Sequence, residues 1–275
     1  MPGHRPIYTR AVLEQKIRPT PAETSSSGPP GARTEILGVP VDAVGREEAL
    51  SRCERVLAQG AAAQPLQIVT LNPEMVMRAR RDPTFREVLQ RSGLVLADGA
   101  GISWAARWLG RPLPERVPGV DLLFELCSLC ARRGWSVYLL GAAPGVAQEA
   151  AERLKAEIPG LLVAGCGSGS PEEAESTAAE IRARGARLLA VAFGAPRQEL
   201  FLGQHLAATG CAVGIGVGGS FDYLSGRVRR APAAMRKRGL EWLFRLVRQP
   251  WRLPRMLRAA PFFLLVMRQR RSLAH

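Results

Sequence analysis

Short apolar runs alternate with amphipathic stretches along most of the chain. The runs that predict buried strands are EILGVPVD, LQIVTL, LVLAD, SVYLLG, LLVAG, RLLAVAFG and CAVGIGVGG. The intervening stretches repeat apolar residues every three or four positions and predict helices at 45–59, 73–91 with a break at Pro83, 101–109, 119–133, from Pro144, 171–184 and 196–208. Strands and helices in alternation predict an α/β fold with a mostly parallel sheet that helices cover on both faces.

The two ends of the chain differ from this alternating body. Residues 1–34 are rich in Pro, Ser, Thr and Gly, and this composition predicts a disordered arm. The arm contains no apolar stretch typical of a signal peptide. The alternating pattern extends over 35–226, which we expect to form the α/β domain, and residues 227–275 form a basic appendage.

The positive charge of the protein is concentrated in this appendage. The whole chain has 38 Lys and Arg against 24 Asp and Glu, a net charge of +14. Residues 227–275 hold 14 of these basic residues and only one acid, Glu241, so the rest of the chain is close to neutral. Charge gathered in one segment predicts binding to phosphates or to anionic lipid. We expect no nucleic-acid partner, because nucleic-acid binding usually spreads basic charge across a folded face.

The appendage also has a marked apolar character. As a helix, 240–249 gathers its polar residues in one narrow arc and exposes a wide apolar face. Prolines at 250, 254 and 261 predict that short helices follow. The longest uncharged apolar run, 259–267, is far shorter than the roughly 20 residues that span a bilayer.

We therefore expect the appendage to lie in the interface of an anionic membrane. The expected membrane contacts are Trp251, Phe262, Phe263 and Leu265. The plainer alternative is an amphipathic helix that packs on the body and leaves its arginine face in water.

Polar residues and glycines gather where the predicted strands end. Asn72, Asp98, Gly141, Gln198 and Asp222 each follow or close a different strand. Parallel sheets bind ligands at the carboxyl ends of their strands, where glycines allow close approach and helix N-termini offer N–H groups. Each position alone has a structural explanation as a helix cap or turn. Five of them at one sheet edge favour a ligand pocket.

The sequence lacks the residues that several common kinds of active site require. No G-x-G-x-x-G dinucleotide motif follows the first strand with an acid about 20 residues on. The Walker loop and a D-x-D pair are absent, and His205 is the only histidine in the body. Cys127 and Cys130 form a single CxxC without a second ligand pair, which favours buried thiols over zinc. The odd number of cysteines, five, indicates free thiols in a reducing cytosol. A carboxylate base and arginines remain, so we expect neither a metal nor a cofactor.

Four segments resemble the WecG/TagA/CpsF glycosyltransferases in order and spacing, from about Glu35 to Arg268. They are TLNPEMVMRAR, VLADGAGISWAARWLGRPLPERVPGVDL, FGAPRQE and GVGGSFDYLSGRVRRAP followed by GLEWLFRL. The resemblance implies a Rossmann-like fold with a basic C-terminal appendage. It implies an inverting, metal-independent hexosyltransferase that moves N-acetylmannosamine or its uronic acid from a UDP-sugar to an undecaprenyl-diphosphate-linked sugar. Such enzymes act in cell-envelope polysaccharide or teichoic acid synthesis, in the cytoplasm and peripherally on the inner face of the bacterial membrane.

The resemblance also implies roles for individual residues. Asp98 would be the general base, and Thr70 and Asn72 would line the same pocket. The donor would be held by Gln198, by Asp222 near the uracil, and by Arg245, Arg252 and Arg255 at the diphosphate. From its place at a strand end, Gly141 is expected to border the donor as well. An oligomer is compatible with the sequence.

Three alternatives remain open from the sequence. The first is a family member that uses another UDP-hexose for exopolysaccharide. The second is a non-catalytic α/β protein that binds nucleotides or nucleic acid, and the third is an oxidoreductase with an unusual dinucleotide turn. Binding of UDP in preference to NAD or an oligonucleotide would separate these classes.

Overall fold

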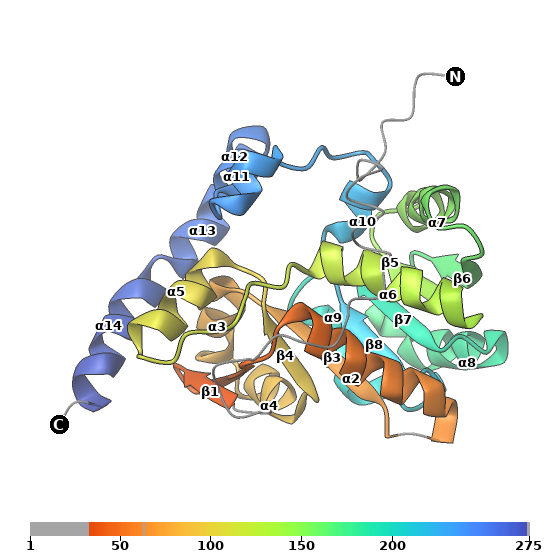
Figure 1. Cartoon of the computed structure of the whole chain (residues 1–275), viewed down its shortest axis with the longest axis horizontal. Coiled ribbons are helices and arrows are strands. Elements are labelled where there is room, and N and C mark those ends of the chain that lie inside the picture. The colour runs from red at the N-terminus through yellow and green to blue at the C-terminus, as the bar shows by residue number, and fades with distance from the viewer. Residues whose placement is uncertain (1–32, 63, 274–275) are drawn as a thin grey trace. The chain divides into compact units, whose positions relative to one another are not determined.

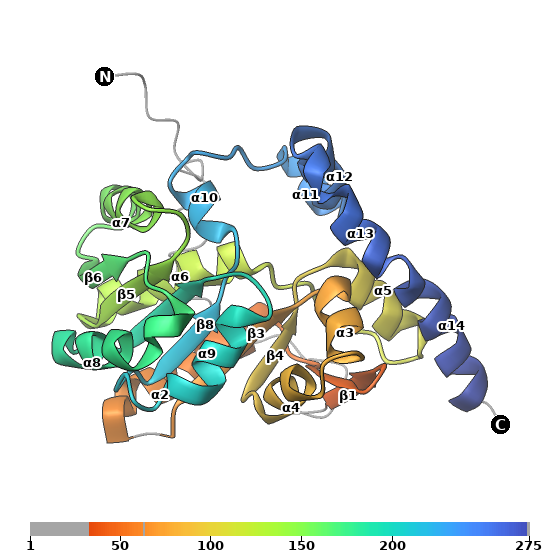
Figure 2. The same cartoon turned by 180° about the vertical axis from the view of Figure 1, so that it is seen from behind.

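The computed structural model describes residues 33–273 apart from residue 63, and Figures 1 and 2 show it from opposite sides. The expected disordered arm, 1–34, lies outside the described residues except for Arg33 and Thr34, which open a strand. The described chain forms two compact units. Unit 1 comprises 47–68 and 119–228, and unit 2 comprises 33–46, 69–118 and 229–273. The basic appendage therefore belongs almost entirely to unit 2.

Six strands form a parallel sheet in the order β4-β3-β8-β7-β5-β6. They are β3 (Leu66–Leu71), β4 (Leu94–Ala97), β5 (Ser136–Gly141), β6 (Leu162–Gly167), β7 (Leu188–Ala192) and β8 (Val213–Gly216). Strands β4, β7 and β8 are buried along their whole length, as continuous apolar runs predict for a parallel sheet covered on both faces. The register pairs Val137 with Leu188 and Ser136 with Leu162. The expected α/β fold with a mostly parallel sheet is confirmed.

Helices cover the unit 1 strands on both sides. Figure 1 shows α2 (Arg46–Gln59) and α6 (Gly119–Arg133) in front of the sheet, and Figure 2 shows α8 (Ala174–Arg184) and α9 (Arg197–His205) on its other face. The remaining helices of this unit are α7 (Val146–Glu157), α10 (Ser220–Leu224) and the short turns η1 (Gly60–Ala62) and η2 (Pro171–Glu173). The amphipathic stretches that predicted α2, α6, α7, α8 and α9 match these helices to within a few residues, whereas α10 and η1 were not predicted.

Unit 2 begins with a hairpin rather than the single strand expected from EILGVPVD. Strands β1 (Arg33–Ile36) and β2 (Val39–Asp42) pair antiparallel. Leu37 and Gly38 join them with φ values of 51° and 83°, the left-handed conformations of a tight two-residue turn. Asp42 fixes the hairpin, because its carboxylate accepts from the Val95 N–H of β4 over 2.7 Å.

Apart from strand β4 and the end of β3, the rest of the regular structure of unit 2 is helical. The helices are α3 (Pro73–Ala79), α4 (Pro83–Arg91), α5 (Ala100–Trp108), α11 (Ala233–Lys237), α12 (Glu241–Arg248), η3 (Pro250–Arg252), α13 (Leu253–Ala259) and α14 (Pro261–Leu273). The expected break at Pro83 is confirmed, and Asp82 caps the helix that begins there. In the appendage, Pro250 and Pro261 each begin an element, whereas Pro254 lies inside the first turn of α13. Figures 1 and 2 show α13 and α14 beside α3 and α5.

The cysteines are free, as the sequence predicted. Cys53, Cys127, Cys130 and Cys211 are buried, and Cys166 is half-buried. Burial raises the pKa of the Cys53 and Cys130 thiols to about 12, so both stay protonated at neutral pH. These thiols pack as small apolar side chains.

Candidate functional site

Asp98 comes directly after strand β4, at the carboxyl edge of the unit 2 strands. Its backbone N–H donates to the carbonyl of Leu71, the last residue of β3, over 3.0 Å. This bond holds Asp98 beside the end of the neighbouring strand, where the residue is half-buried. A partly exposed carboxylate at a strand end can take a proton from a hydroxyl within hydrogen-bond reach.

The loop after β3 lies against the loop that carries Asp98. A Cβ on Gly99 would come within 3.2 Å of Pro73 Cδ and 3.6 Å of Asn72 Cβ. Asn72 caps helix α3, because its side-chain oxygen accepts a backbone N–H of the first turn. Thr70 is buried in β3, two residues earlier. The structure thus brings Asn72 and Asp98 together at adjacent strand ends.

The appendage contacts this same region of unit 2. Gly239, with φ of 72°, packs so closely that a Cβ there would lie 2.8 Å from Ala100 Cβ, two residues after Asp98. Arg116 Nη2 donates to the carbonyl of Arg236 over 3.0 Å. Arg236 Nε is itself buried, with no hydrogen-bond partner among the described residues. A buried guanidinium N–H of this kind suits an anionic acceptor.

Helix α12 does not sort into a buried apolar face and an exposed polar face. Phe244 and Leu246 are half-buried, and Arg248 is exposed. Glu241 pairs with Arg230 over 3.5 Å, and their side chains are 19% and 10% exposed. Two guanidinium nitrogens of Arg245 are buried. Trp242 and Val247, by contrast, are 50% and 73% exposed. A surface helix normally buries its apolar face, and the exposure of Trp242 and Val247 departs from that rule. The plain alternative of a packed helix with a solvated arginine face stays open.

Exposed large apolar side chains recur along the appendage. They are Trp242, Leu243, Val247, Trp251, Leu253, Leu257, Phe263 and Leu264. Outside the appendage, only Trp108 and Leu162 are comparable among the described residues. Several large apolar side chains left exposed in one segment favour an interaction site there.

One expected membrane contact is wrong in this structure, because Phe262 is fully buried. Phe262 and Val266 occupy the inner side of α14, one helical turn apart. Leu265 is half-buried. Phe263 is partly exposed, and its ring packs against that of Trp104 in an edge-to-face arrangement, with 5.0 Å between the ring centroids. Trp251 is exposed, as expected for a membrane contact, although membrane contact itself stays a prediction.

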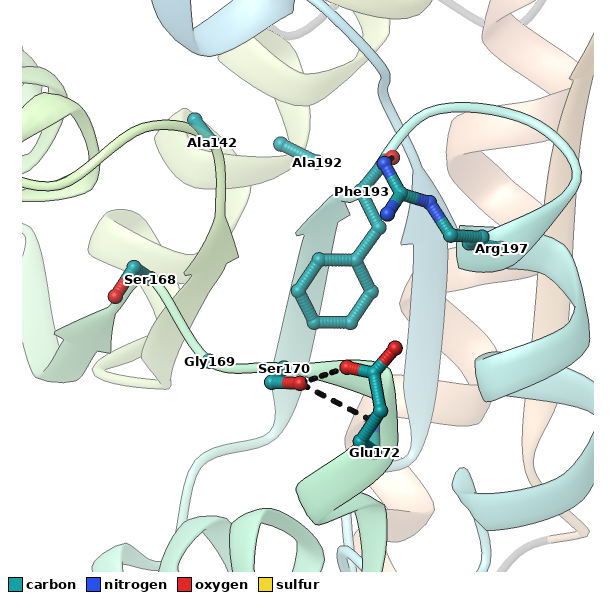
Figure 3. A pocket seen from close by; sticks show the side chains of 8 residues that line it. All are labelled: Ala142, Ser168, Gly169, Ser170, Glu172, Ala192, Phe193 and Arg197. Atoms are coloured by element: carbon teal, nitrogen blue, oxygen red, sulfur yellow. Dashed lines mark hydrogen bonds between the residues drawn. The ribbon is translucent and has the colours of Figure 1, made fainter.

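Unit 1 has a pocket of about 280 Å³ at the carboxyl ends of its strands. The chain runs from β5 outward to β6 and then returns to β7 on the other side of β5, which makes the ends of β5 and β7 a topological switch point. Figure 3 shows the side chains that line the pocket: Ala142, Ser168, Gly169, Ser170, Glu172, Ala192, Phe193 and Arg197. Hydroxyls, a carboxylate, an aromatic ring and a guanidinium there suit a ligand with both a flat ring and polar groups.

Gln198 lies beside this pocket but points into the protein. Its side chain is buried, and Oε1 accepts from the N–H groups of Gly194 at 3.0 Å and Gly218 at 2.9 Å. Its Nε2 donates to Glu199 over 2.6 Å. The structure therefore gives Gln198 a bracing position between the loops after β7 and β8, and its expected contact with a donor stays a prediction.

Gly141 and Asp222 also lie in unit 1. Gly141 closes β5 with φ of 106°, and a Cβ there would come within 2.8 Å of the Ala192 carbonyl carbon, so only glycine fits beside β7. Asp222 is half-buried on α10, and its carbonyl accepts from the Val228 N–H over 2.9 Å. Their expected roles in donor binding stay predictions.

Sequence reasoning missed two residues that the structure places in these regions. Arg116 holds the backbone of the appendage, and Glu199 holds Gln198. Both stood inside quoted segments, PERVPGVDL and GAPRQE. The partner of Arg116 is 120 residues away in sequence, and the pair of Gln198 and Glu199 is buried. A pattern of residue types reveals neither fact.

Arg245 belongs to unit 2 with Asp98, whereas the side chains of Arg252 and Arg255 lie outside the described part of the structure. Among the described residues, no group of His, Cys, Asp and Glu side chains is arranged to hold a metal ion. None of the described helices is both long enough and apolar enough to cross a membrane.

Comparison with known proteins agrees with these features. Residues 34–275 match the profile of the Glycosyl transferase WecG/TagA/CpsF family. A Bacillus spizizenii protein named N-acetylglucosaminyldiphosphoundecaprenol N-acetyl-beta-D-mannosaminyltransferase is 35% identical over 207 residues, which cover 75% of this chain and 80% of that protein. A Bacillus subtilis protein of the same name is 33% identical over 205 residues, which cover 74% of this chain and 80% of its own length. The chain belongs to the WecG/TagA/CpsF family of glycosyltransferases.

Proposed function

We propose that this protein transfers N-acetylmannosamine from a UDP-linked donor to N-acetylglucosaminyl-diphospho-undecaprenol. Both Bacillus relatives carry names that state this sugar and this acceptor. The structural observation that carries the proposal is within unit 2: the strand-end carboxylate of Asp98 and the arginine-rich appendage share one compact unit. The products would serve the synthesis of a cell-surface polysaccharide or teichoic acid.

The proposed chemistry begins at Asp98. A sugar hydroxyl is a weak nucleophile, and a carboxylate that accepts its proton as the new bond forms typically contributes about 10²–10⁴-fold in rate. The hydroxyl oxygen attacks the anomeric carbon of the donor from the face opposite the leaving UDP, and the anomeric configuration inverts. Asn72 beside Asp98 supports this assignment, because it offers a polar contact for a sugar at the same edge.

The arginines would stabilise the departing diphosphate. Negative charge grows on UDP as the glycosidic bond breaks, and fixed guanidinium groups stabilise that charge where it develops. Arg245 has two buried guanidinium nitrogens, and Arg236 has a buried Nε without a hydrogen-bond partner among the described residues. We also assign Arg116 to this group, because it fastens the Arg236 backbone. Arg252 and Arg255 keep their predicted part in the same task.

Within unit 1, taken by itself, the pocket offers groups that suit a nucleoside. Phe193 offers an aromatic face, Ser168 and Ser170 offer hydroxyls, and Arg197 adds a positive charge. The pocket's place at a topological switch point supports nucleoside binding there, because such crevices bind nucleotides in parallel α/β sheets. Asp222 keeps its predicted place near the uracil.

We further propose that the appendage lies on the anionic face of the membrane that holds the lipid acceptor. Exposed Trp242, Val247 and Trp251 would enter the interface, and the neighbouring arginines would meet lipid phosphates. Helix α12 supports a double role for this segment, since two guanidinium nitrogens of Arg245 are buried while Trp242 and Val247 are exposed.

A panel of UDP-sugars with a soluble lipid-diphosphate-N-acetylglucosamine analogue tests the proposal. UDP release should be fastest with UDP-N-acetylmannosamine and should require the acceptor. Asp98→Asn is the matched control, since it keeps the shape of the side chain and removes the base. If another UDP-hexose were preferred by tenfold or more, the exopolysaccharide alternative would replace the proposed donor. Absence of UDP release with every donor would refute the transferase activity.

A further inference from the structure

Gln198 and Glu199 form a buried polar pair between two strand-end loops of unit 1. Glu199 is fully buried, and its Oε1 accepts from Gln198 Nε2 over 2.6 Å. Gln67 Nε2 donates to the Glu199 backbone carbonyl over 3.0 Å, which fixes this residue from β3. The proposed reaction gives Glu199 no task. A buried carboxyl is costly, so its presence beside a functional loop calls for a physical explanation.

Glu199 determines which way the Gln198 amide points. Gln198 Oε1 accepts from two backbone N–H groups, those of Gly194 and Gly218. An amide turned the other way would set its NH₂ group against these two donors and would lose both bonds. Glu199 Oε1 takes the bond from Nε2 and so stabilises the productive orientation.

Strand β8 packs directly against the side chains of Gln198 and Glu199 and leaves no free space beside them. A Cβ on Gly216 would lie 2.7 Å from Gln198 Nε2 and 2.8 Å from Glu199 Oε1. Glycine at this position therefore lets the pair pack directly against the strand. The second oxygen of Glu199, Oε2, is buried without a hydrogen-bond partner among the described residues.

The braced loops border the unit 1 pocket. Gly194 lies between Phe193 and Arg197 in sequence, and both of these residues line the pocket. Arg197 Nη2 also donates to the Phe193 carbonyl over 3.1 Å. Any movement of the Gly194 backbone would therefore shift an aromatic ring and a guanidinium that face the ligand.

We infer that Glu199 is a positioning residue for donor binding: it orients Gln198, which holds the loops after β7 and β8 in the geometry that the UDP moiety needs. This inference rests on the proposed function for its ligand. Glu199 does not touch the donor in this scheme, and its influence passes through Gln198 and the two glycine amides.

Glu199→Met and Glu199→Gln separate positioning from packing. Glu199→Met fills the space but cannot accept from Gln198, and we expect UDP affinity, measured by calorimetry, to fall by roughly tenfold, as the loss of one orienting hydrogen bond implies. Glu199→Gln keeps an acceptor oxygen and should recover most of this affinity. Hydrogen exchange at the Gly194 and Gly218 amides, followed by NMR, should become faster in Glu199→Met and remain slow in Glu199→Gln.

A double variant tests whether the effect passes through Gln198. UDP should bind to Gln198→Met and to Gln198→Met/Glu199→Met with the same affinity, because the first change already removes the brace. Additive losses would overturn the inference, as would a folded Glu199→Met protein with unchanged affinity and unchanged amide exchange. If Glu199→Met does not fold, Gly216→Ala displaces the same pair from β8 and should give the same two changes.

The two readouts also distinguish the inference from the proposed function. If the unmodified protein does not bind UDP, the proposed donor is wrong. Amide exchange at Gly194 and Gly218 then still decides the role of Glu199, since faster exchange in Glu199→Met supports it and unchanged exchange refutes it.

Discussion

Glu199 makes the stability of this protein depend on pH in a direction that the structure specifies. Burial raises the pKa of its carboxyl from the usual 4.5 to about 7, against smaller opposing effects of its hydrogen bonds to Gln198 and the backbone. The folded state therefore retains a proton that the unfolded chain has already released. The stability of the protein should be highest below about pH 4.5 as far as this group is concerned, and should fall as the pH rises to about 7.

The magnitude follows from the two pKa values. Each pKa unit corresponds to about 1.36 kcal/mol, so the step from 4.5 to about 7 gives roughly 3 kcal/mol in total. Part of this loss has already occurred at pH 5, so about 2.5 kcal/mol should be lost between pH 5 and pH 8. That is a substantial share of the 5–15 kcal/mol or so that stabilises a typical protein.

Glu199→Gln removes this titration and keeps the side-chain shape. The buried amide changes the free energy of unfolding by an amount that does not depend on pH. The informative quantity is therefore how the difference in unfolding free energy between the two proteins changes with pH. Urea unfolding of both proteins at several pH values between 5 and 8 measures it. The variant should gain about 2.5 kcal/mol relative to the unmodified protein across this range. Glu87→Gln, the same change at an exposed position on α4, is the matched control.

A difference between the two proteins that stays constant from pH 5 to pH 8 would refute the reasoning. It would mean that the Glu199 carboxyl ionises in the folded protein as readily as in the unfolded chain. A gain for the unmodified protein at high pH would be a stronger contradiction, because it would require a favourable partner for the charged carboxylate.

Four further predictions concern the proposed reaction and the appendage. Asp98→Asn should lower turnover by at least about 100-fold and leave UDP affinity unchanged, whereas near-normal turnover would exclude Asp98 as the base. EDTA should leave transfer intact in a UDP-release assay, and activity that disappeared with EDTA and returned with Mg²⁺ would contradict the role given to the arginines. Trp251→Ser should weaken sedimentation with anionic vesicles, whereas Leu162→Ser, which replaces an exposed apolar side chain outside the appendage, should not. Equal effects of the two substitutions would argue against a membrane-binding appendage. Phe262→Ala should cost about 3–5 kcal/mol in unfolding free energy because the ring is fully buried, and a cost below about 1 kcal/mol would place the ring at the surface after all.

Local pattern was sufficient for most of the secondary structure. Apolar runs found the six strands of the parallel sheet, since a strand buried on both faces needs a continuous apolar sequence. The helix break at Pro83 was also evident, because proline lacks the N–H of a helix interior and Asp82 before it can cap the next helix. The hairpin at Leu37 and Gly38 was missed, since a leucine with positive φ is uncommon and its turn is stabilised by pairing between the strands.

Part of the candidate site was predictable from the apolar runs that mark the strands. Asp98 and Asn72 each follow an apolar strand, so their place at one sheet edge follows from the parallel arrangement. The bracing role of Gln198 was not predictable, because it depends on the N–H groups of Gly194 and Gly218, which follow two different strands.

The order of most helices and strands, the basic appendage and the residues at the strand ends could be read from the chain, because these follow from local spacing and composition. Which side of each appendage helix is buried could not, because it depends on packing. PFFLLVM has no polar residue to mark an outer face, and packing within unit 2 buries Phe262 and Val266 while Phe263 and Leu264 stay exposed. In α12 the packing even opposes the usual pattern, turning Arg245 inward and Trp242 outward. Burial is a property of contacts between distant segments, and these contacts form only when the chain has folded.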